Sequence, residues 1–183
     1  MLIRLLNLLG LLGVSLVLLV AFYYQLFHNE LPCPLCLLQR GCFVALGIGF
    51  ALNLSVGPSR LHDAMMLVSG LLGAGTALRQ VLLHIAPGDA GYGSLFFSMH
   101  FYTWAFVAFA ASILYVALLL LVEAGEGSPA RRHTQGAGLL ARLALWLFVL
   151  VVGANLLSTL LECGFGACAD NPTYYEWLGP KAA

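Results

Sequence analysis

A run of uncharged, mostly apolar residues covers positions 5–27. A helix needs ~20 such residues to cross the hydrocarbon core of a bilayer, so this run is long enough to span it. A cleaved secretory signal has a shorter apolar core and small residues before the cleavage site, whereas this run ends near the bulky Tyr23 and Tyr24. We therefore expect an uncleaved first membrane helix, with both tyrosines in the interfacial aromatic belt.

Four further apolar runs follow, at 36–54, 63–83, 95–122 and 139–161. Hydrophobic residues make up 61% of the chain and charged residues only 9%, whereas a soluble domain carries roughly a quarter charged residues. The formal net charge is zero and there is no basic tract, so nothing indicates a nucleic-acid partner. The sequence predicts an all-α membrane protein in contact with lipid, built as a four-helix transmembrane bundle plus a fifth C-terminal transmembrane helix.

The chain divides by composition into four parts. Residues 1–122 are expected to form the four-helix bundle, and residues 123–138 a polar cytoplasmic loop. Residues 139–161 are expected to form the fifth helix, and residues 162–183 a polar tail on the opposite side of the membrane.

Lysine and arginine are unevenly distributed between the two sides that these helices define. Cytoplasmic flanks and short loops carry an excess of both residues. With the N-terminus inside, the cytoplasmic side receives five arginines: Arg4, Arg60, Arg131, Arg132 and Arg142. The outer side has Lys181 in the tail, besides Arg40 and Arg79 inside helices. This asymmetry predicts a cytoplasmic N-terminus and an outer C-terminus.

In this orientation two pairs of cysteines, Cys33/Cys36 and Cys163/Cys168, lie on the outer, oxidising face. The first pair stands at the expected start of a helix, where the partial positive charge of the helix N-terminus lowers the pKa of a thiol. Arg40 lies one turn beyond Cys36 on the same helix face. The pattern is typical of a reversible redox disulfide, and the alternatives are a structural disulfide or two of four metal ligands.

Several polar side chains share one depth near the outer ends of the helices: Arg40, Arg79, His84 and His100, with Tyr102 and Trp104 close by. His100 is expected about a turn and a half into the fourth helix. Ionisable groups inside a bilayer cost roughly 2.5–3.5 kcal/mol and usually mark a site, although at this depth the arginines can also extend to the headgroups. Cationic donors, imidazole and aromatic rings and a thiol suit a lipid-soluble electron acceptor with carbonyl oxygens, namely a quinone. We expect the four ionisable side chains to bind it.

Three segments together resemble the bacterial DsbB family, the quinone-dependent disulfide bond formation proteins of the inner membrane. The first is Cys-Pro-Leu-Cys at 33–36, followed by Arg40 at the start of the second helix. The second is Leu-Arg-Gln-Val-Leu-Leu-His at 78–84, and the third is the segment 98–106. The resemblance covers roughly residues 1–122.

The resemblance implies a function and a location. Cys33 and Cys36 would form the quinone-linked disulfide, with Cys36 next to the quinone, and Arg40 would assist its reduction. The quinone would be ubiquinone or menaquinone, and the partner would be a soluble periplasmic thiol oxidase with a thioredoxin-like fold, similar to DsbA. The protein would lie in the bacterial inner membrane, with its C-terminus in the periplasm, and it would bind no metal.

The chain departs from the family pattern in the position of its second cysteine pair. The family carries that pair in the outer loop between the third and fourth spans, but the corresponding loop at 85–94 contains no cysteine. We hypothesise that Cys163 and Cys168 replace the loop pair, so that electrons pass from the partner to the tail pair, then to Cys33/Cys36, then to the quinone. The alternative is that the tail pair is a static disulfide.

Three other functions remain open from the sequence. The first is an enzyme similar to vitamin K epoxide reductase, although that family places its active cysteine pair late in the bundle. The second is a metal-binding membrane protein in which all four of these cysteines act as thiolate ligands. The third is a scaffold subunit without turnover. The sequence leaves the identities of the quinone and the soluble partner open, and also the oligomeric state.

Overall fold

The computed structural model describes residues 1–125 and 138–179 of the 183-residue chain. Most of the predicted cytoplasmic loop, with Arg131 and Arg132, lies outside the described residues, and so does Lys181.

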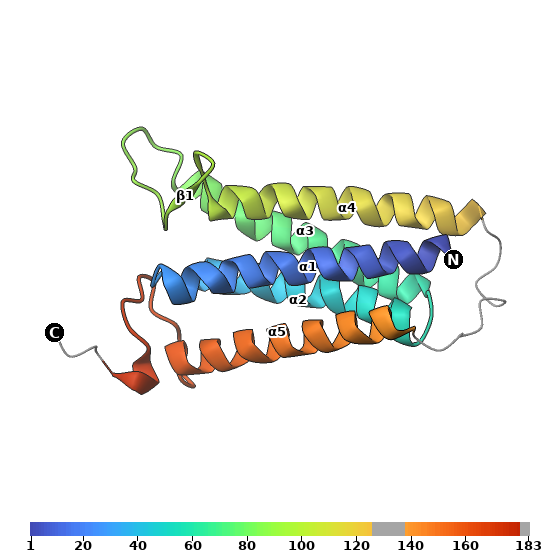
Figure 1. Ribbon diagram of the computed structural model, residues 1–183. Coiled ribbons are helices and arrows are strands. Elements are labelled where there is room, and N and C mark those ends of the chain that lie inside the picture. Colours follow the sequence, from blue (N-terminus) through green and yellow to red (C-terminus); the bar gives the residue numbers. More distant parts are fainter. Residues whose placement is uncertain (126–137, 180–183) are drawn as a thin grey trace.

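Five long helices make up most of the described chain (Figure 1). They are α1 (Leu2–Phe27), α2 (Pro34–Ser55), α3 (Arg60–Leu83), α4 (Phe101–Gly125) and α5 (Leu139–Cys163). Each is long and apolar enough to cross a membrane. The predicted all-α membrane fold with five spanning helices is therefore confirmed, and the chain is a multi-pass membrane protein.

The helices pack side by side, with α2 between α1 and α3, α3 against α4, and α5 against α1 and α2 (Figure 1). Glycines allow large side chains from neighbouring helices to approach closely, which is how membrane helices gain packing energy. Gly73 faces the ring of Phe109, which stacks on Phe43 with ring centroids 3.8 Å apart. The ring of Phe148 packs directly against Gly47, so α5 can lie close to α2 at this position.

The fourth helix begins later than the sequence predicts. Residues 95–100 form a small antiparallel hairpin, in which β1 (Leu95–Phe96) pairs with β2 (Met99–His100), and α4 starts only at Phe101. The two turn residues, Phe97 and Ser98, have φ angles of 46° and 65°, as a tight two-residue hairpin requires. The expectation that His100 lies inside the fourth helix is therefore wrong. A short apolar segment does not by itself distinguish a strand from the first turns of a helix.

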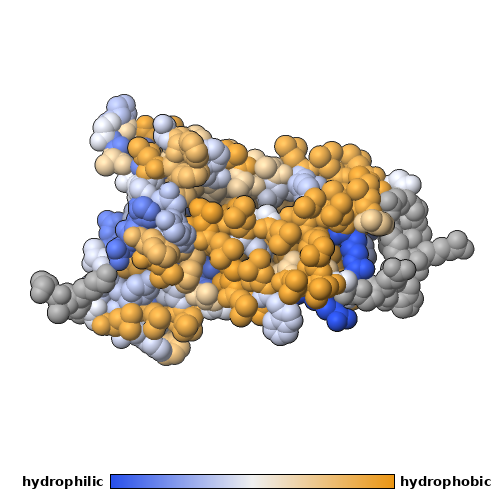
Figure 2. Space-filling model, in the orientation of Figure 1, coloured by the Kyte–Doolittle hydropathy of each residue, from blue (hydrophilic) through white to orange (hydrophobic). Residues whose placement is uncertain are grey.

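The distribution of hydrophobic residues over the surface is the one expected for a protein surrounded by lipid. Hydrophobic residues cover the flanks of the helices, whereas hydrophilic residues collect towards the two ends of the bundle (Figure 2). At the end that contains the N-terminus, Asn53 of α2 donates to Asn7 of α1 at 3.0 Å and to Asp63 of α3 at 3.1 Å. The candidate functional residues lie at the other end.

Candidate functional site

The first cysteine pair forms a disulfide at the start of α2. Cys33 is the N-cap of this helix, and its Sγ accepts a hydrogen bond from the backbone N–H of Cys36 at 3.2 Å. Pro34 occupies the first helical position, which proline favours because a missing N–H costs nothing there. The motif thus fixes both sulfurs at the positive end of a helix, where negative charge is favoured.

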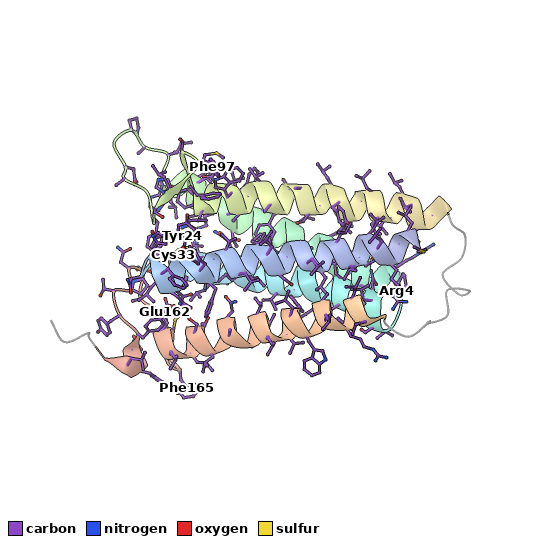
Figure 3. All side chains as sticks on the ribbon, viewed as in Figure 1. Arg4, Tyr24, Cys33, Phe97, Glu162 and Phe165 are labelled. Atoms are coloured by element: carbon purple, nitrogen blue, oxygen red, sulfur yellow. A yellow bond between two sulfur atoms is a disulfide. The ribbon has the colours of Figure 1, made fainter. Side chains whose placement is uncertain are left out.

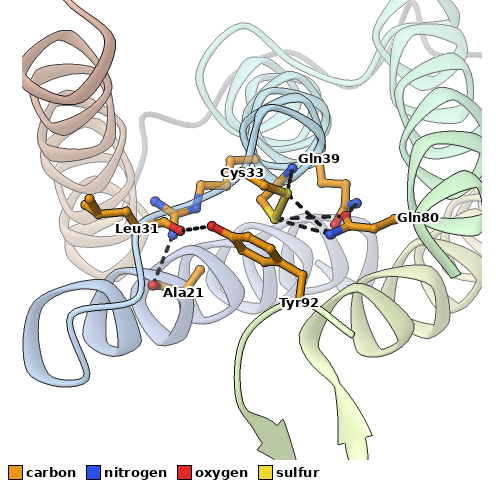
Figure 4. Close-up of a disulfide and its surroundings, with 8 residues drawn as sticks. Ala21, Leu31, Cys33, Gln39, Gln80 and Tyr92 are labelled. Atoms are coloured by element: carbon orange, nitrogen blue, oxygen red, sulfur yellow. Dashed lines mark hydrogen bonds between the residues drawn. A yellow bond between two sulfur atoms is a disulfide. The ribbon is translucent and has the colours of Figure 1, made fainter. Parts of the chain in front are cut away.

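Two buried amide side chains lie at this disulfide: Gln80 of α3 contacts the sulfurs, and Gln39 of α2 contacts Gln80 (Figure 4). The Nε2 atom of Gln80 lies 3.3 Å from Cys33 Sγ and 3.6 Å from Cys36 Sγ. Gln39 donates from its Nε2 to Gln80 Oε1 at 2.8 Å. The sequence alone indicates no role for either glutamine.

Cys36 also lines a cavity of about 320 Å³ between α1, α2, α4 and the loop that precedes α4. Most of its lining is apolar or aromatic, and the aromatic residues are Tyr24, Phe43, Tyr92, Phe96, Phe101, Tyr102 and Trp104. The same wall also contains the polar side chains of Glu30, Gln39 and Arg40. An apolar chamber with a few polar donors beside a reactive sulfur fits a flat ring with carbonyl oxygens, and its volume is within the usual range for small-molecule sites.

Arg40 is held in the cavity wall by three neutral acceptors. Its NH1 donates to Gln25 Oε1 at 2.6 Å and to Asn155 Oδ1 at 3.3 Å, and its NH2 donates to the carbonyl oxygen of Ala21 at 3.1 Å. None of these acceptors is charged, so these hydrogen bonds do not neutralise the positive charge of the guanidinium. Because Asn155 belongs to α5, the fifth helix takes part in holding this arginine.

Gln25 joins the same arginine to the tail. Its Nε2 donates to Ser158 Oγ of α5 at 2.6 Å and to the hydroxyl of Tyr175 at 3.0 Å. Tyr175 directly precedes the short 3₁₀ helix η2 (Glu176–Leu178). One amide of α1 thus connects the cavity wall, the fifth helix and the tail.

Glu162 is a buried carboxylate in the same region. It is 3% exposed, and within residues 1–125 and 138–179 neither of its oxygens has a hydrogen-bond partner. It is close enough to Arg40 to interact with it electrostatically. Burial raises the pKa of Tyr92 on the cavity wall, and the negative charges of Glu162 and Glu30 raise it further.

The second cysteine pair, Cys163 and Cys168, also forms a disulfide. Cys163 is the last residue of α5 and is buried, whereas Cys168 in the tail is half-buried. Gly164 between them has a φ of 59°, a conformation that favours glycine and turns the chain back. Figure 3 labels Cys33 and Glu162 at the same end of the bundle, so the two disulfides lie at one end.

Three predicted quinone ligands lie away from the cavity lining. Arg79 is exposed on the surface of α3. His84 and His100 both stack on Tyr102, with ring centroids 5.6 Å and 5.1 Å away. Since Tyr102 lines the cavity, the two histidines contact a cavity residue and lie behind it.

The loop near His84 is ordered by one exposed carboxylate. Asp89 accepts hydrogen bonds from the backbone N–H of Gly91 at 2.7 Å and from His84 Nδ1 at 3.1 Å. These bonds, the Gly91 bond most of all, hold the pKa of Asp89 below its usual value.

Several contacting residues were missed because their roles depend on packing between distant helices: Gln25, Gln39, Gln80, Asn155 and Glu162. The one signal available in the sequence was the presence of polar side chains within or at the ends of apolar runs, where they are costly unless partnered.

The fold and this site define a class: a multi-pass membrane protein with a disulfide whose Cys36 lies in the wall of an apolar cavity. The sequence matches the family model described as disulfide bond formation protein DsbB over residues 3–93. The chain belongs to the DsbB family of membrane disulfide bond formation proteins. The matched range includes Cys33, Cys36, Arg40 and Gln80 and ends before α4, α5 and the tail.

Curated proteins named disulfide bond formation protein B show the same partial similarity. One from Burkholderia thailandensis is 37% identical over 99 residues, one from Stutzerimonas stutzeri 33% over 82, and one from Xanthomonas axonopodis pv. citri 36% over 87. These alignments cover 50%, 43% and 45% of this chain, and 56%, 50% and 51% of the relatives. The chain thus spans about half the length of the curated relatives it matches. No solved structure matches it significantly.

Proposed function

We propose that this protein is a quinone-dependent thiol-disulfide oxidoreductase that reoxidises a soluble periplasmic thiol oxidase similar to DsbA. The observation that carries the proposal is the Cys33–Cys36 disulfide, whose Cys36 shares a cavity wall with Arg40. A bound quinone, ubiquinone or menaquinone, would supply the two-electron acceptor for this pair.

The residues around the cavity have separate tasks in this proposal. Arg40 would stabilise negative charge that develops on the reduced acceptor or on the Cys36 sulfur, because its three hydrogen bonds leave its positive charge in place. The aromatic wall, with Tyr102 backed by His84 and His100, would hold the ring and exclude water. Arg79 is exposed on α3 and does not line the cavity, so its expected part in binding the ring has no support from its position.

The tail pair would receive electrons first. The partner's thiolate would attack the accessible Cys168, and its second thiol would complete the exchange, so that Cys163 and Cys168 become thiols as the partner becomes oxidised. The tail thiols would then reduce Cys33–Cys36 by the same chemistry. The hydrogen bonds from Gln25 to Ser158 and Tyr175 support a role for the tail, because they hold it close to Arg40 in the cavity wall.

We also propose that the protein lies in the bacterial inner membrane, with a cytoplasmic N-terminus and a periplasmic C-terminus. The excess of arginine on the N-terminal side supports this orientation. In that orientation the end of the bundle that holds the two disulfides faces the oxidising compartment.

Purified protein in detergent, supplied with a small dithiol and a soluble quinone analogue, tests the activity. We expect quinone reduction that is lost in both Cys33→Ser and Cys36→Ser, because each variant removes the disulfide. Cys42→Ala, which removes the free cysteine, is the matched control and should retain the activity. Equal quinone reduction by Cys36→Ser and Cys42→Ala would contradict the proposal.

The other functions have less support. Family membership favours the DsbB-like function over one similar to vitamin K epoxide reductase. A four-thiolate metal site would need free thiols, and these four sulfurs are paired as two disulfides.

A further inference from the structure

The proposed electron route leaves the buried amide of Gln80 without a task. This side chain is 1% exposed and lies near the end of α3, facing the start of α2. Its single Nε2 group reaches both sulfurs of the Cys33–Cys36 disulfide, the nearer one at 3.3 Å (Figure 4). Gln80 therefore touches the atoms that would react.

Gln39 fixes the direction in which this amide points. Gln39 is 5% exposed and donates to Gln80 Oε1 at 2.8 Å. Because the oxygen of Gln80 is bound in this way, its NH₂ group faces the sulfurs. With Gln39 oriented as it is, turning Gln80 round would bring two NH₂ groups together and leave buried donors unpaired. In the orientation present, Nε2 of Gln80 lies nearer to Cys36 Sγ, at 3.6 Å, than its Oε1 does, at 3.9 Å.

The N–H groups that point at the sulfurs should stabilise the reduced cysteine pair more than the disulfide. A disulfide sulfur is a weak acceptor, whereas hydrogen bonds to an ionised acceptor are roughly twice as strong as neutral ones. Cys33 Sγ receives two N–H groups, one from Gln80 and one from the backbone of Cys36. A group that stabilises the reduced form of a pair makes its disulfide a stronger oxidant.

We propose that Gln80, oriented by Gln39, stabilises the thiolate formed when the Cys33–Cys36 disulfide is opened, and so makes this disulfide a stronger oxidant. This inference rests on the proposed function, in which the tail pair is the reductant. A tail thiolate bonds to one sulfur of the disulfide, the Cys33–Cys36 bond breaks, and its electron pair remains on the other sulfur. The second tail thiol then displaces the first sulfur, so that two electrons and two protons pass from the tail pair to Cys33 and Cys36.

The test measures the first pair alone, in protein purified without quinone. Cys163→Ser, Cys168→Ser and Cys42→Ala together leave Cys33 and Cys36 as the two cysteines of the chain. This protein is equilibrated in glutathione redox buffers and its reduced fraction is counted by alkylation. In the same background, Gln80→Met removes the N–H donor at similar volume.

We expect Gln80→Met to shift the equilibrium about tenfold towards the disulfide, the size of one hydrogen bond to a charged group. The pH at which the reduced thiols become reactive to alkylation should rise by about one unit. Gln39→Met should shift both quantities in the same direction but less, because Gln80 keeps its N–H and loses only its orientation. Thr76→Val is the control, since its hydroxyl donates to Gly73 of its own helix.

Equal equilibrium constants and pH profiles in Gln80→Met and Thr76→Val would overturn the inference. Quinone reduction by the unaltered protein is measured separately. If that reduction is absent while Gln80→Met still shifts the equilibrium, the proposed function fails and the role of Gln80 stands.

Discussion

The two disulfides of this protein stand in different surroundings at the same end of the bundle. Cys33–Cys36 caps a membrane helix, receives N–H donors from Gln80 and from its own helix, and borders an apolar cavity. Cys163–Cys168 closes the end of α5 and continues into a polar tail. The first setting can stabilise charge on sulfur beside a lipid-soluble acceptor. The second can be reached by a soluble protein.

The polar contacts between α1, α2, α5 and the tail connect these two settings. Gln25 and Asn155 both accept from Arg40, and Gln25 also donates to Ser158 and Tyr175. The region that resembles known relatives therefore depends on the region beyond the match for part of its cavity wall. Substitutions at Arg40, on the cavity side, and at Gln25, on the tail side, test this connection separately.

The largest effect is expected on the cavity side, from Arg40→Met. Loss of the positive charge from the cavity wall that Arg40 shares with Cys36 should lower quinone reduction by a small dithiol about 10²-fold, the usual effect of removing a group that stabilises developing charge. Arg40→Lys keeps the charge but loses the multiple hydrogen bonds, and should lie between Met and the unaltered protein. Steady-state rates with a quinone analogue measure this, and an unchanged rate in Arg40→Met would exclude Arg40 from the reaction.

A smaller and more selective effect is expected from Gln25→Leu. The change removes the hydrogen bonds from Gln25 to Ser158 and Tyr175 and one of the three acceptors of Arg40. Oxidation of a reduced thioredoxin-like partner should therefore fall about tenfold, the factor that ~1.4 kcal/mol represents. Quinone reduction by a small dithiol should fall less, because that reaction bypasses the tail. Asn7→Leu, a buried amide at the opposite end of α1, is the control. Equal losses in both reactions would indicate a general loss of structure.

The smallest effect concerns the loop beside the cavity. Since its hydrogen bonds lower the pKa of Asp89, its carboxylate stabilises the fold at pH values above about 4 and loses this effect as the pH falls through the lowered value. Asp89→Asn should therefore lower the thermal midpoint slightly at pH 7, and this difference should shrink as the pH falls below about 4. A difference that grows on acidification would show that this sign is wrong.

The sequence predicted the helices and the first cysteine pair because both depend on local patterns. Runs of ~20 apolar residues specify spanning helices, and the spacing of Cys33, Cys36 and Arg40 specifies one helix face. The hairpin at 95–100 was missed because most of its residues are apolar and lead directly into the helix that follows.

The rest of the site depends on which face of each helix points inward. Neighbouring residues on a helix are about 100° apart, and this rotation turns Arg79 to the surface while it buries Gln80. Gln25 and Ser158 are 133 residues apart in the chain. The sequence alone does not bring such distant helices together.

The central claim is that electrons enter through the tail pair and leave through the cavity pair. The most direct measurement compares two reactions in one variant, Cys163→Ser with Cys168→Ser. We predict that this variant loses oxidation of a reduced thioredoxin-like partner while it keeps quinone reduction by a small dithiol. Partner oxidation at the rate of the unaltered protein would contradict the account, because the partner would then reach Cys33–Cys36 without the tail.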